Sequence, residues 1–509
     1  MPDDRMRHAM LFDVNDILRP GVASMAGTAN DWQEPRLEPD RIQPTMQSFN
    51  AWLALADIAD IDAVDVPGAY VLLPWGVRLA EHFAVLVRAL AASENYPEVA
   101  FPHVVRAHVF DPVSDLVDTE RALLKVGNSA GRERLVLSPT GEQQVYTYWA
   151  RSLRAREHYP ARVFQRTRYF RPTSSHRRSG GGVFKSLEAV DVFEFHGCDL
   201  AEAVAESASE LLSLRLAGFC ARVGVPMIWS ARPPWTNNGH LYSWCAGGDA
   251  LLPSGQTVQV SGAYFQAQKY SRRFDIGVGR QPSRDYAWQH CGFVTRRLMW
   301  AALFNAAARG TCLHPIIAPV EAVVLATNLS STEAGLISSA IADTGLAGRR
   351  VHAELRLNRQ QLNRQLKLWT QRKTPLVILI FGSGAGRHDV SRCVAMRGDS
   401  GRELQMQDLT QIGHFIPSVL DEIAATLERG GRVEVRDACA WAQSLRQVAR
   451  TRDDAKIAVA PIVGNERCIR ALESEVRGEI LGLTASLDDQ ACVVSGELSR
   501  LRAIIAPRL

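Results

Sequence analysis

The chain has 509 residues, of which 46% are hydrophobic and 22% are charged. This composition excludes a disordered or collagen-like chain and predicts a globular protein of roughly three or four domains. The formal net charge of only +4 excludes a surface uniformly covered in positive charge, so any binding of anions has to be local.

The nine cysteines are scattered and form no Cys-x-x-Cys pair. They predict reduced, mostly buried thiols and a cytoplasmic location. No uninterrupted apolar run approaches the length of a membrane span, and the N-terminus lacks the pattern of a secretion signal. We therefore expect neither secretion nor insertion into a membrane.

The N-terminal half predicts an alternation of strands and helices. Residues 1–50 mix Pro, Asp, Asn and Gln without periodicity and predict an irregular extension. Apolar residues recur at helical spacing over 77–94, and residues 99–105 form a candidate strand. A further strand ends at Ser138, and a helix is predicted to begin at Glu142 after Pro139 and Thr140.

The C-terminal half continues in the same way. A mostly apolar helix is predicted over residues 293–308. Strands at 321–327 and 375–381, with a helix between them, indicate a separate α/β domain. Residues 426–509 form a last mixed segment.

The stretch RTRYFRPTSSHRRSGGGVFK, which begins at Arg166, combines clustered arginines with three consecutive glycines. A flexible basic surface loop and a loop that binds an anion both have this composition. The surrounding motifs favour the second interpretation. Phe170-Arg171-x-Thr173 before a Gly-rich loop resembles the second signature of class II aminoacyl-tRNA synthetases, which covers ATP. GFVTRRL, with Gly292 and Arg296, is similar to the third signature of that class.

The resemblance extends over nearly the whole chain to prolyl-tRNA synthetases of the archaeal and eukaryotic type. In SPTGEQQVY, Thr140 and Glu142 stand where that family holds the amino group of its substrate. KSLEAVDVFEFH places Asp191 at the family's second acidic position, and QVSGAYFQAQKYSRRF places Tyr264 where the family has His. Taken alone, Glu142 is equally well explained as a first-turn acid favoured by the helix dipole, and Asp191 as an exposed acid on a strand.

The resemblance also implies ATP, Mg²⁺ and the residues that bind the nucleotide. Adenylate formation needs cations that neutralise a carboxylate and a phosphate, and guanidinium groups do this bidentately. Arg171 and Arg296 are therefore the candidate catalytic residues. Gln259 and Lys185 complete the candidate ATP site, because Val183 replaces an Arg of the family and Lys185 lies two residues further on.

Other family positions have changed as well. Thr173 replaces the Glu of the second signature that helps to read adenine. In the structural zinc site of the family only Cys468 and Cys492 remain, with Val463 and Ser495 at the other two ligand positions. Two thiolates do not make a closed tetrahedral site, so we expect no zinc.

The resemblance implies an α/β (α+β) fold of three parts after the extension. These parts are a class II catalytic domain with an antiparallel sheet, an α/β anticodon-binding-like domain, and a small C-terminal α/β domain. Their predicted bounds are 51–318, 319–425 and 426–509.

The function implied is ATP-dependent activation of a proline-like or different amino acid to an aminoacyl-adenylate, with transfer to tRNA or another acceptor. A homodimer built around the helix at 77–94 is expected. Two alternatives stay open, namely a tRNA-independent amino-acid ligase of a biosynthetic pathway and a catalytically inactive RNA-binding or regulatory protein. Tyr264 and Asp191 further suggest a pocket that does not accept proline in the usual way.

Overall fold

The structure is a computed structural model of the chain. It describes residues 41–509 except for 62, 65, 67, 116–122, 128–133, 173–181, 186–187, 234–240, 281, 347, 383–391, 407–408, 455 and 477–479.

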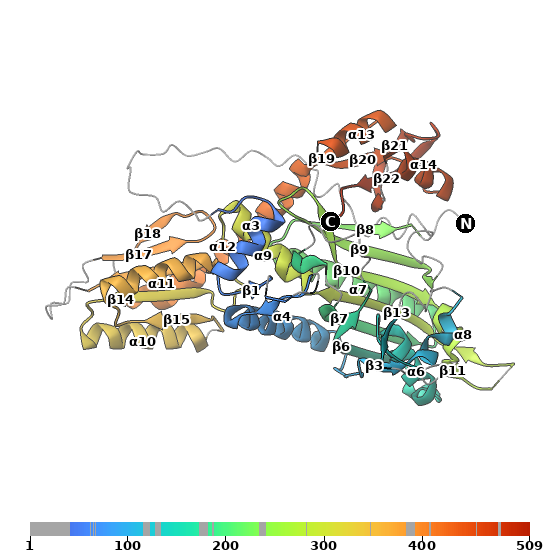
Figure 1. The fold of residues 1–509 in the computed structure, drawn as a ribbon, viewed down its shortest axis with the longest axis horizontal. Coiled ribbons are helices and arrows are strands. Elements are labelled where there is room, and N and C mark those ends of the chain that lie inside the picture. Colours follow the sequence, from blue (N-terminus) through green and yellow to red (C-terminus); the bar gives the residue numbers. More distant parts are fainter. Residues whose placement is uncertain are drawn as a thin grey trace.

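A large sheet of ten strands forms the centre of the molecule (Figure 1). Its strand order is β19-β20-β22-β21-β8-β9-β10-β13-β7-β6, and every neighbouring pair except β19 and β20 is antiparallel. Six of its strands are β6 (Ala161–Phe170), β7 (Glu188–Asp199), β8 (Met227–Arg232), β9 (Trp244–Leu251), β10 (Thr257–Ala267) and β13 (Trp288–Thr295). The sheet is therefore built mainly from one continuous region of sequence, 161–295.

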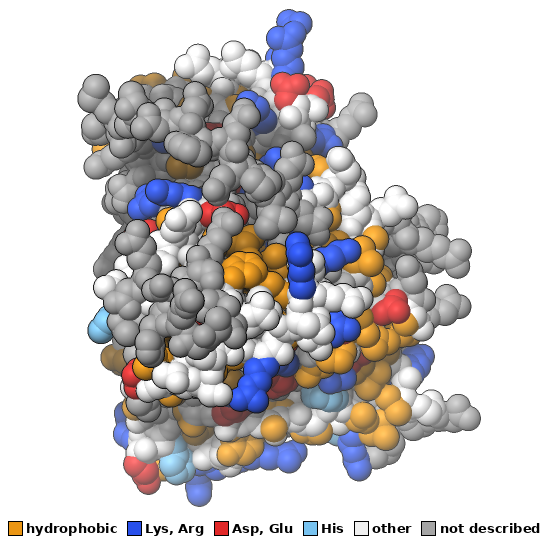
Figure 2. Space-filling model, turned by 90° about the vertical axis from the view of Figure 1, so that its left-hand side faces the viewer, with side chains coloured by type: hydrophobic (Ala, Val, Ile, Leu, Met, Phe, Trp, Pro, Cys, Tyr) orange, Lys and Arg blue, Asp and Glu red, His pale blue; other side chains and the backbone are white. Residues whose placement is uncertain are grey.

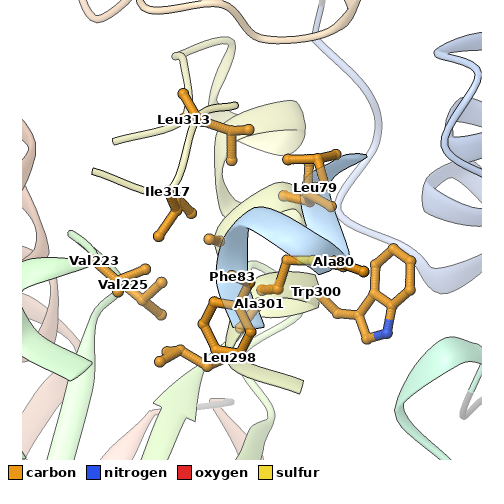
Figure 3. Close-up of a cluster of buried hydrophobic side chains, with 14 of the residues drawn as sticks. Leu79, Ala80, Phe83, Val223, Val225, Leu298, Trp300, Ala301, Leu313 and Ile317 are labelled. Atoms are coloured by element: carbon orange, nitrogen blue, oxygen red, sulfur yellow. The ribbon is translucent and has the colours of Figure 1, made fainter. Parts of the chain in front are cut away.

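Three long helices cover this sheet and form the main core with it. They are α4 (Pro74–Ser93), α7 (Glu202–Arg222) and α9 (Arg297–Arg309). Leu79 and Phe83 of α4 lie beside Leu298 and Ala301 of α9 in a buried cluster (Figure 3). The predicted helix over 293–308 was wrong in its first residues, because those residues continue β13 in register with β7 and β10.

The N-terminal elements surround this core. Helix α3 (Met46–Leu55) begins inside the predicted irregular extension, and its Phe49, Trp52 and Leu53 are buried. The predicted helix over 77–94 is confirmed as α4, which begins three residues earlier with Pro74 at its first position. Smaller elements are β1 (Ala59–Asp60), β2 (Val71–Leu72), β3 (Val104–Arg106), β4 (Leu124–Val126), β5 (Leu135–Leu137), α6 (Glu142–Ser152), α8 (Lys269–Phe274), β11 (Gly277–Val278) and β12 (Asp285–Tyr286).

A second sheet of five strands, in the order β15-β14-β16-β17-β18, lies at one end of the molecule (Figure 1). The predicted strands at 321–327 and 375–381 are β14 and β16, two of its three inner strands, and both are nearly fully buried. The elements are β14 (Ala322–Thr327), α10 (Ser331–Leu346), β15 (Val351–Glu354), α11 (Arg359–Gln371), β16 (Leu376–Phe381), β17 (Arg392–Arg397) and β18 (Glu403–Gln405). Helix α12 (Ile412–Ala438) follows and runs across residue 425, where the sequence predicts a boundary.

The C-terminal segment joins the large sheet. Its elements are β19 (Cys439–Trp441), α13 (Leu445–Asp453), β20 (Ile457–Pro461), α14 (Glu466–Val476), β21 (Ile480–Ala491) and β22 (Leu498–Ile505). Strand β21 meets β8 through the pair Leu483 and Ala231. The large sheet thus joins strands of the predicted catalytic domain to strands of the predicted C-terminal domain. The division into domains stays a prediction.

None of the helices within the described residues is both long and apolar enough to cross a membrane. All nine cysteines are free thiols, and eight of them are buried.

Candidate active site

A cavity of about 590 Å³ opens beside the strands β6, β7, β10 and β13 and the start of α6. Six of the residues predicted for the site line it: Thr140, Glu142, Arg171, Gln259, Tyr264 and Arg296. They come from four separate stretches of the chain, so the cavity is the place where the motifs meet. Asp191 and Lys185 are not among its lining residues.

Strand β7 explains the position of Asp191. Side chains on a strand alternate between its two faces, and Val190, Val192 and Glu194 line the cavity. Phe193 and Phe195 belong to the core on the opposite face. Asp191 lies between two of the cavity-lining residues, and its side chain is directed away from the cavity toward the start of α9.

Two arginines hold the carboxylate of Asp191. Arg166 Nε donates to its Oδ1 at 2.7 Å, and Arg296 Nε donates to its Oδ2 at 2.8 Å, with a second bond from Arg296 Nη2. Asp191 and Arg296 are each only 5% exposed. The predicted role of Asp191 as a ligand of the substrate amino group is therefore not favoured by its contacts, since two guanidinium groups already hold the carboxylate.

Arg296 is likewise engaged, although it lines the cavity. Besides its bonds to Asp191, its Nη1 donates to the hydroxyl of Tyr70 at 3.2 Å. Arg297, the next residue, is different. It lines the same cavity, its Nη1 reaches only the carbonyl of Gln259, at 3.5 Å, and no acid among the described residues pairs with it.

Arg297 and Arg171 therefore form a cationic side of the cavity. Arg171 Nε donates to the carbonyl of Pro139 at 2.9 Å, and within the described part of the chain this guanidinium also has no acidic partner. Burial and the neighbouring charge of Arg171 lower the pKa of Arg297 to about 10. Two adjacent guanidinium groups without counter-charges are suited to bind a phosphate.

The carboxylates of Glu142 and Glu194 also line the cavity. Glu142 is the first residue of α6, and its Oε2 accepts a hydrogen bond from Thr140 Oγ1. Burial, and then the negative charge of Glu194, raise the pKa of Glu142. Ser138 Oγ donates to the carbonyl of Thr140 at 2.7 Å, which fixes the turn that leads into the helix.

Glu194 is 8% exposed and is the centre of a hydrogen-bond network. Its Oε2 accepts from Gln165 Nε2 at 3.0 Å and from the Tyr169 hydroxyl at 2.5 Å, and it lies 3.1 Å from His196 Nε2. Burial and the charge of Glu194 raise the pKa of Tyr169, so the phenol remains a donor. The absence of a side chain at Gly141 gives this network its room, because a Cβ there would lie 2.1 Å from Glu194 Oε2.

Aromatic rings close the remaining wall. The ring of Tyr264 lies 4.5 Å from that of Tyr242 and stacks on Phe293 at 6.1 Å. Tyr270 also lines the cavity. Tyr264 therefore turns toward the cavity and does not point into solvent.

The other predicted positions lie elsewhere. Lys185 follows the short helix at 182–184 and does not line the cavity, whereas Val183 does. Thr173 and most of the Gly-rich loop lie outside the described residues.

The C-terminal thiols Cys468 and Cys492 are both buried and interact with each other. The backbone N–H groups of Val494 and Ser495 donate to Cys492 Sγ at 3.5 and 3.4 Å. Nowhere in the described ranges do three or more His, Cys, Asp or Glu side chains gather so as to hold a metal ion.

Comparisons with known proteins agree with this architecture. The chain is 23% identical over 474 residues to the proline–tRNA ligase of Methanopyrus kandleri, covering 90% of this chain and 95% of the relative. It is 24% identical over 486 residues to that of Methanococcoides burtonii, covering 92% and 98%. No family model matches the chain.

Solved structures have the same fold. The prolyl-tRNA synthetase of Giardia lamblia in complex with prolyl-adenylate superimposes with a TM-score of 0.80 at 18% identity, covering 92% of this chain and all of that one. The enzyme of Cryptosporidium parvum with halofuginone and AMPPNP gives 0.79 at 15% identity, covering 93% and 97%.

The fold is that of a class II aminoacyl-tRNA synthetase, and the predicted fold class is confirmed. Within this class, the chain is a divergent relative of the prolyl-tRNA synthetases.

The sequence did not single out Glu194 and Arg297. Side chains of a strand alternate between its two faces, so Glu194 had to share a face with Val190 and Val192. Phe193 and Phe195 lie on the other face. Arg297 stands directly beside Arg296, and no local pattern distinguishes the two.

Proposed function

We propose that the protein activates an amino acid with ATP to form an aminoacyl-adenylate. The observation that carries this proposal is one cavity lined by Arg171 and Arg297, which have no acidic partner among the described residues, and by the carboxylates of Glu142 and Glu194. The two archaeal relatives described above are proline–tRNA ligases. The cationic residues suit a triphosphate and the anionic residues suit an ammonium group.

The chemistry follows from this arrangement of charges. A carboxylate oxygen of the amino acid attacks the α-phosphorus of ATP, a new C–O–P linkage forms, and the bond to the pyrophosphate leaving group breaks. No proton is transferred in this step, so positioning and charge neutralisation carry the rate. Arg171 and Arg297 would neutralise the phosphate oxygens, and Gln259 would orient the nucleotide.

The acidic residues of the cavity would hold the amino acid. Glu142, with Thr140 beside it, would accept hydrogen bonds from the α-ammonium group. Arg296 lines the cavity but is held by Asp191, so we assign it to positioning, together with contact to phosphate through the part that faces the cavity. Mg²⁺ would arrive with the ATP phosphates, because such ions commonly keep several waters and only one or two protein carboxylates.

The reaction is tested by exchange of labelled pyrophosphate into ATP across a panel of amino acids. Arg297→Met should reduce the exchange rate by about 10²-fold or more while the protein stays folded, because it removes a desolvated charge and keeps the bulk. Arg446→Met, on the exposed face of α13, is the matched control and should leave the rate unchanged. Absence of exchange with every amino acid would instead favour a catalytically inactive binding protein.

We propose tRNA as the acceptor, in the cytoplasm. Support comes from the named activity of the relatives and from the five-stranded sheet with its helices that follows the catalytic region. Among the described residues on this face, Lys and Arg side chains are scattered (Figure 2). Charging of total tRNA, with RNase-treated tRNA as the control, separates this acceptor from a carrier protein or a small molecule.

We also propose a homodimer. Val77 and Val85 on α4 are 46% and 57% exposed, and Val104 on β3 is 42% exposed. These apolar side chains lie in the region that the sequence predicts to be an interface. Light scattering at micromolar concentration should give twice the mass of the 56.1 kDa chain, and a monomer would contradict this proposal.

A further inference from the structure

Three glutamates line the cavity, and one of them, Glu188, pairs with Arg168 at 2.6 Å, so Glu142 and Glu194 remain to face a ligand. Glu142 and Thr140 suffice for the α-ammonium of an amino acid, and Glu194 lines the same cavity on a neighbouring element. Gly141 directly precedes Glu142 in the chain, and a Cβ on it would lie only 2.1 Å from Glu194 Oε2. The two acids are therefore close to the same glycine. The effect of Glu194 on the pKa of Glu142 shows that the two charges interact.

Three polar groups of the protein surround one of the two carboxylate oxygens of Glu194. Gln165 Nε2 and the Tyr169 hydroxyl donate to a single oxygen, Oε2, and His196 Nε2 lies within hydrogen-bond distance of it. In the described part of the chain, Oε1 receives no hydrogen bond, and neither Lys nor Arg pairs with this residue.

Buried carboxylates are normally paired with a cation, because an isolated charge is costly to remove from water. Among the described residues no Lys or Arg pairs with Glu194, and the basic group within hydrogen-bond distance of it is the imidazole of His196, at 3.1 Å. The side of the carboxylate that faces the cavity is thus left for a ligand.

The aromatic side chains of the cavity also favour a cationic ligand. Tyr242, Tyr264, Tyr270 and Phe293 line the cavity, and the first two rings are 4.5 Å apart. Aromatic ring faces attract ammonium groups, and several rings beside a carboxylate form a favourable site for a cationic nitrogen.

We propose that the amino acid this protein activates carries a second, cationic nitrogen in its side chain, as a diamino acid does, with Glu194 as the residue that selects it. This inference rests on the proposed adenylation. The α-ammonium would bind at Glu142 and Thr140, and the side-chain ammonium would bind Glu194 Oε1 against the ring of Tyr264. Proline has only one nitrogen and would leave Glu194 unpaired.

Pyrophosphate exchange is measured with proline, serine, 2,3-diaminopropionate, 2,4-diaminobutyrate, ornithine and lysine. Wild type should show its highest kcat/KM with one of the diamino acids. Glu194→Gln, which keeps the shape of the side chain, should reduce that value by at least about 30-fold and leave serine or proline unchanged or improved. Glu194→Asp should retain part of the preference, and the exposed Glu475→Gln on α14 is the matched control.

The possible results separate this inference from the proposed adenylation. A clear preference of wild type for proline, unaffected by Glu194→Gln in a protein that melts normally, overturns the inference and leaves the proposed adenylation intact. If no amino acid supports exchange, the proposed function fails, and thermal shift with the same amino acids at millimolar concentration still tests the pocket. Stabilisation by a diamino acid that is lost in Glu194→Gln supports the inference, and equal or absent stabilisation overturns it.

Discussion

Replacing Asp191 by Asn should destabilise the protein strongly, although this residue does not line the cavity. Asp191 is 5% exposed and balances two guanidinium groups, Arg296, itself 5% exposed, and Arg166. Asn keeps the shape of the side chain and removes its charge, so Arg296 is left buried with Tyr70 as its remaining partner.

Breaking a buried ion pair in this way costs about 3–5 kcal/mol. For a domain of 150–250 residues each kcal/mol corresponds to roughly 2–4 °C in Tm, so the expected decrease is roughly 6–20 °C. Glu81→Gln is the matched control. Glu81 also pairs with Arg166, but its side chain is 56% exposed, and loss of a surface ion pair costs only about 0–1 kcal/mol.

Thermal unfolding followed by circular dichroism measures both variants. The double variant Asp191→Asn with Arg296→Gln should recover much of the loss, because it also removes the unpaired charge. A Tm for Asp191→Asn within about 2 °C of wild type, or equal to that of Glu81→Gln, would show that the buried pair does not hold β7 to α9.

Three further predictions concern the pH dependence of stability, the metal content and the close packing at Gly141. Burial lowers the pKa of His314 to about 4, below the ordinary value of 6.5, so the unfolded chain binds more protons and stability should fall by roughly 3 kcal/mol as the pH decreases from 6.5 to 4. His314→Gln should lack this part of the decrease in Tm, and identical pH profiles would refute it. Metal analysis should find less than about 0.1 zinc per chain, and EDTA should not change the Tm, because Cys468 and Cys492 supply two ligands of four; stoichiometric zinc would contradict this. Gly141→Ala should reduce exchange by about 10²-fold or more, since its Cβ would displace Glu194; normal exchange would show that the network tolerates rearrangement.

The sequence by itself determined the local structure and the composition of much of the site. Periodicity over 77–94 predicts α4, and the apolar runs at 321–327 and 375–381 predict the centre of the second sheet. Local patterns suffice there because helix and strand periodicity depend on neighbouring residues. The signatures also predict that Thr140, Glu142 and Arg171 meet, and all three line one cavity.

Only the tertiary structure decided which charges are free. Arg296 and Arg297 are adjacent and identical in type, but Asp191, 105 residues before Arg296, pairs with the first and leaves the second open to the cavity. Similarly, the strand register of β7 turns Asp191 toward α9 and Glu194 into the cavity. A charge binds a ligand when no other residue neutralises it, and such pairing between distant residues depends on how sheet and helix pack, which local sequence does not contain.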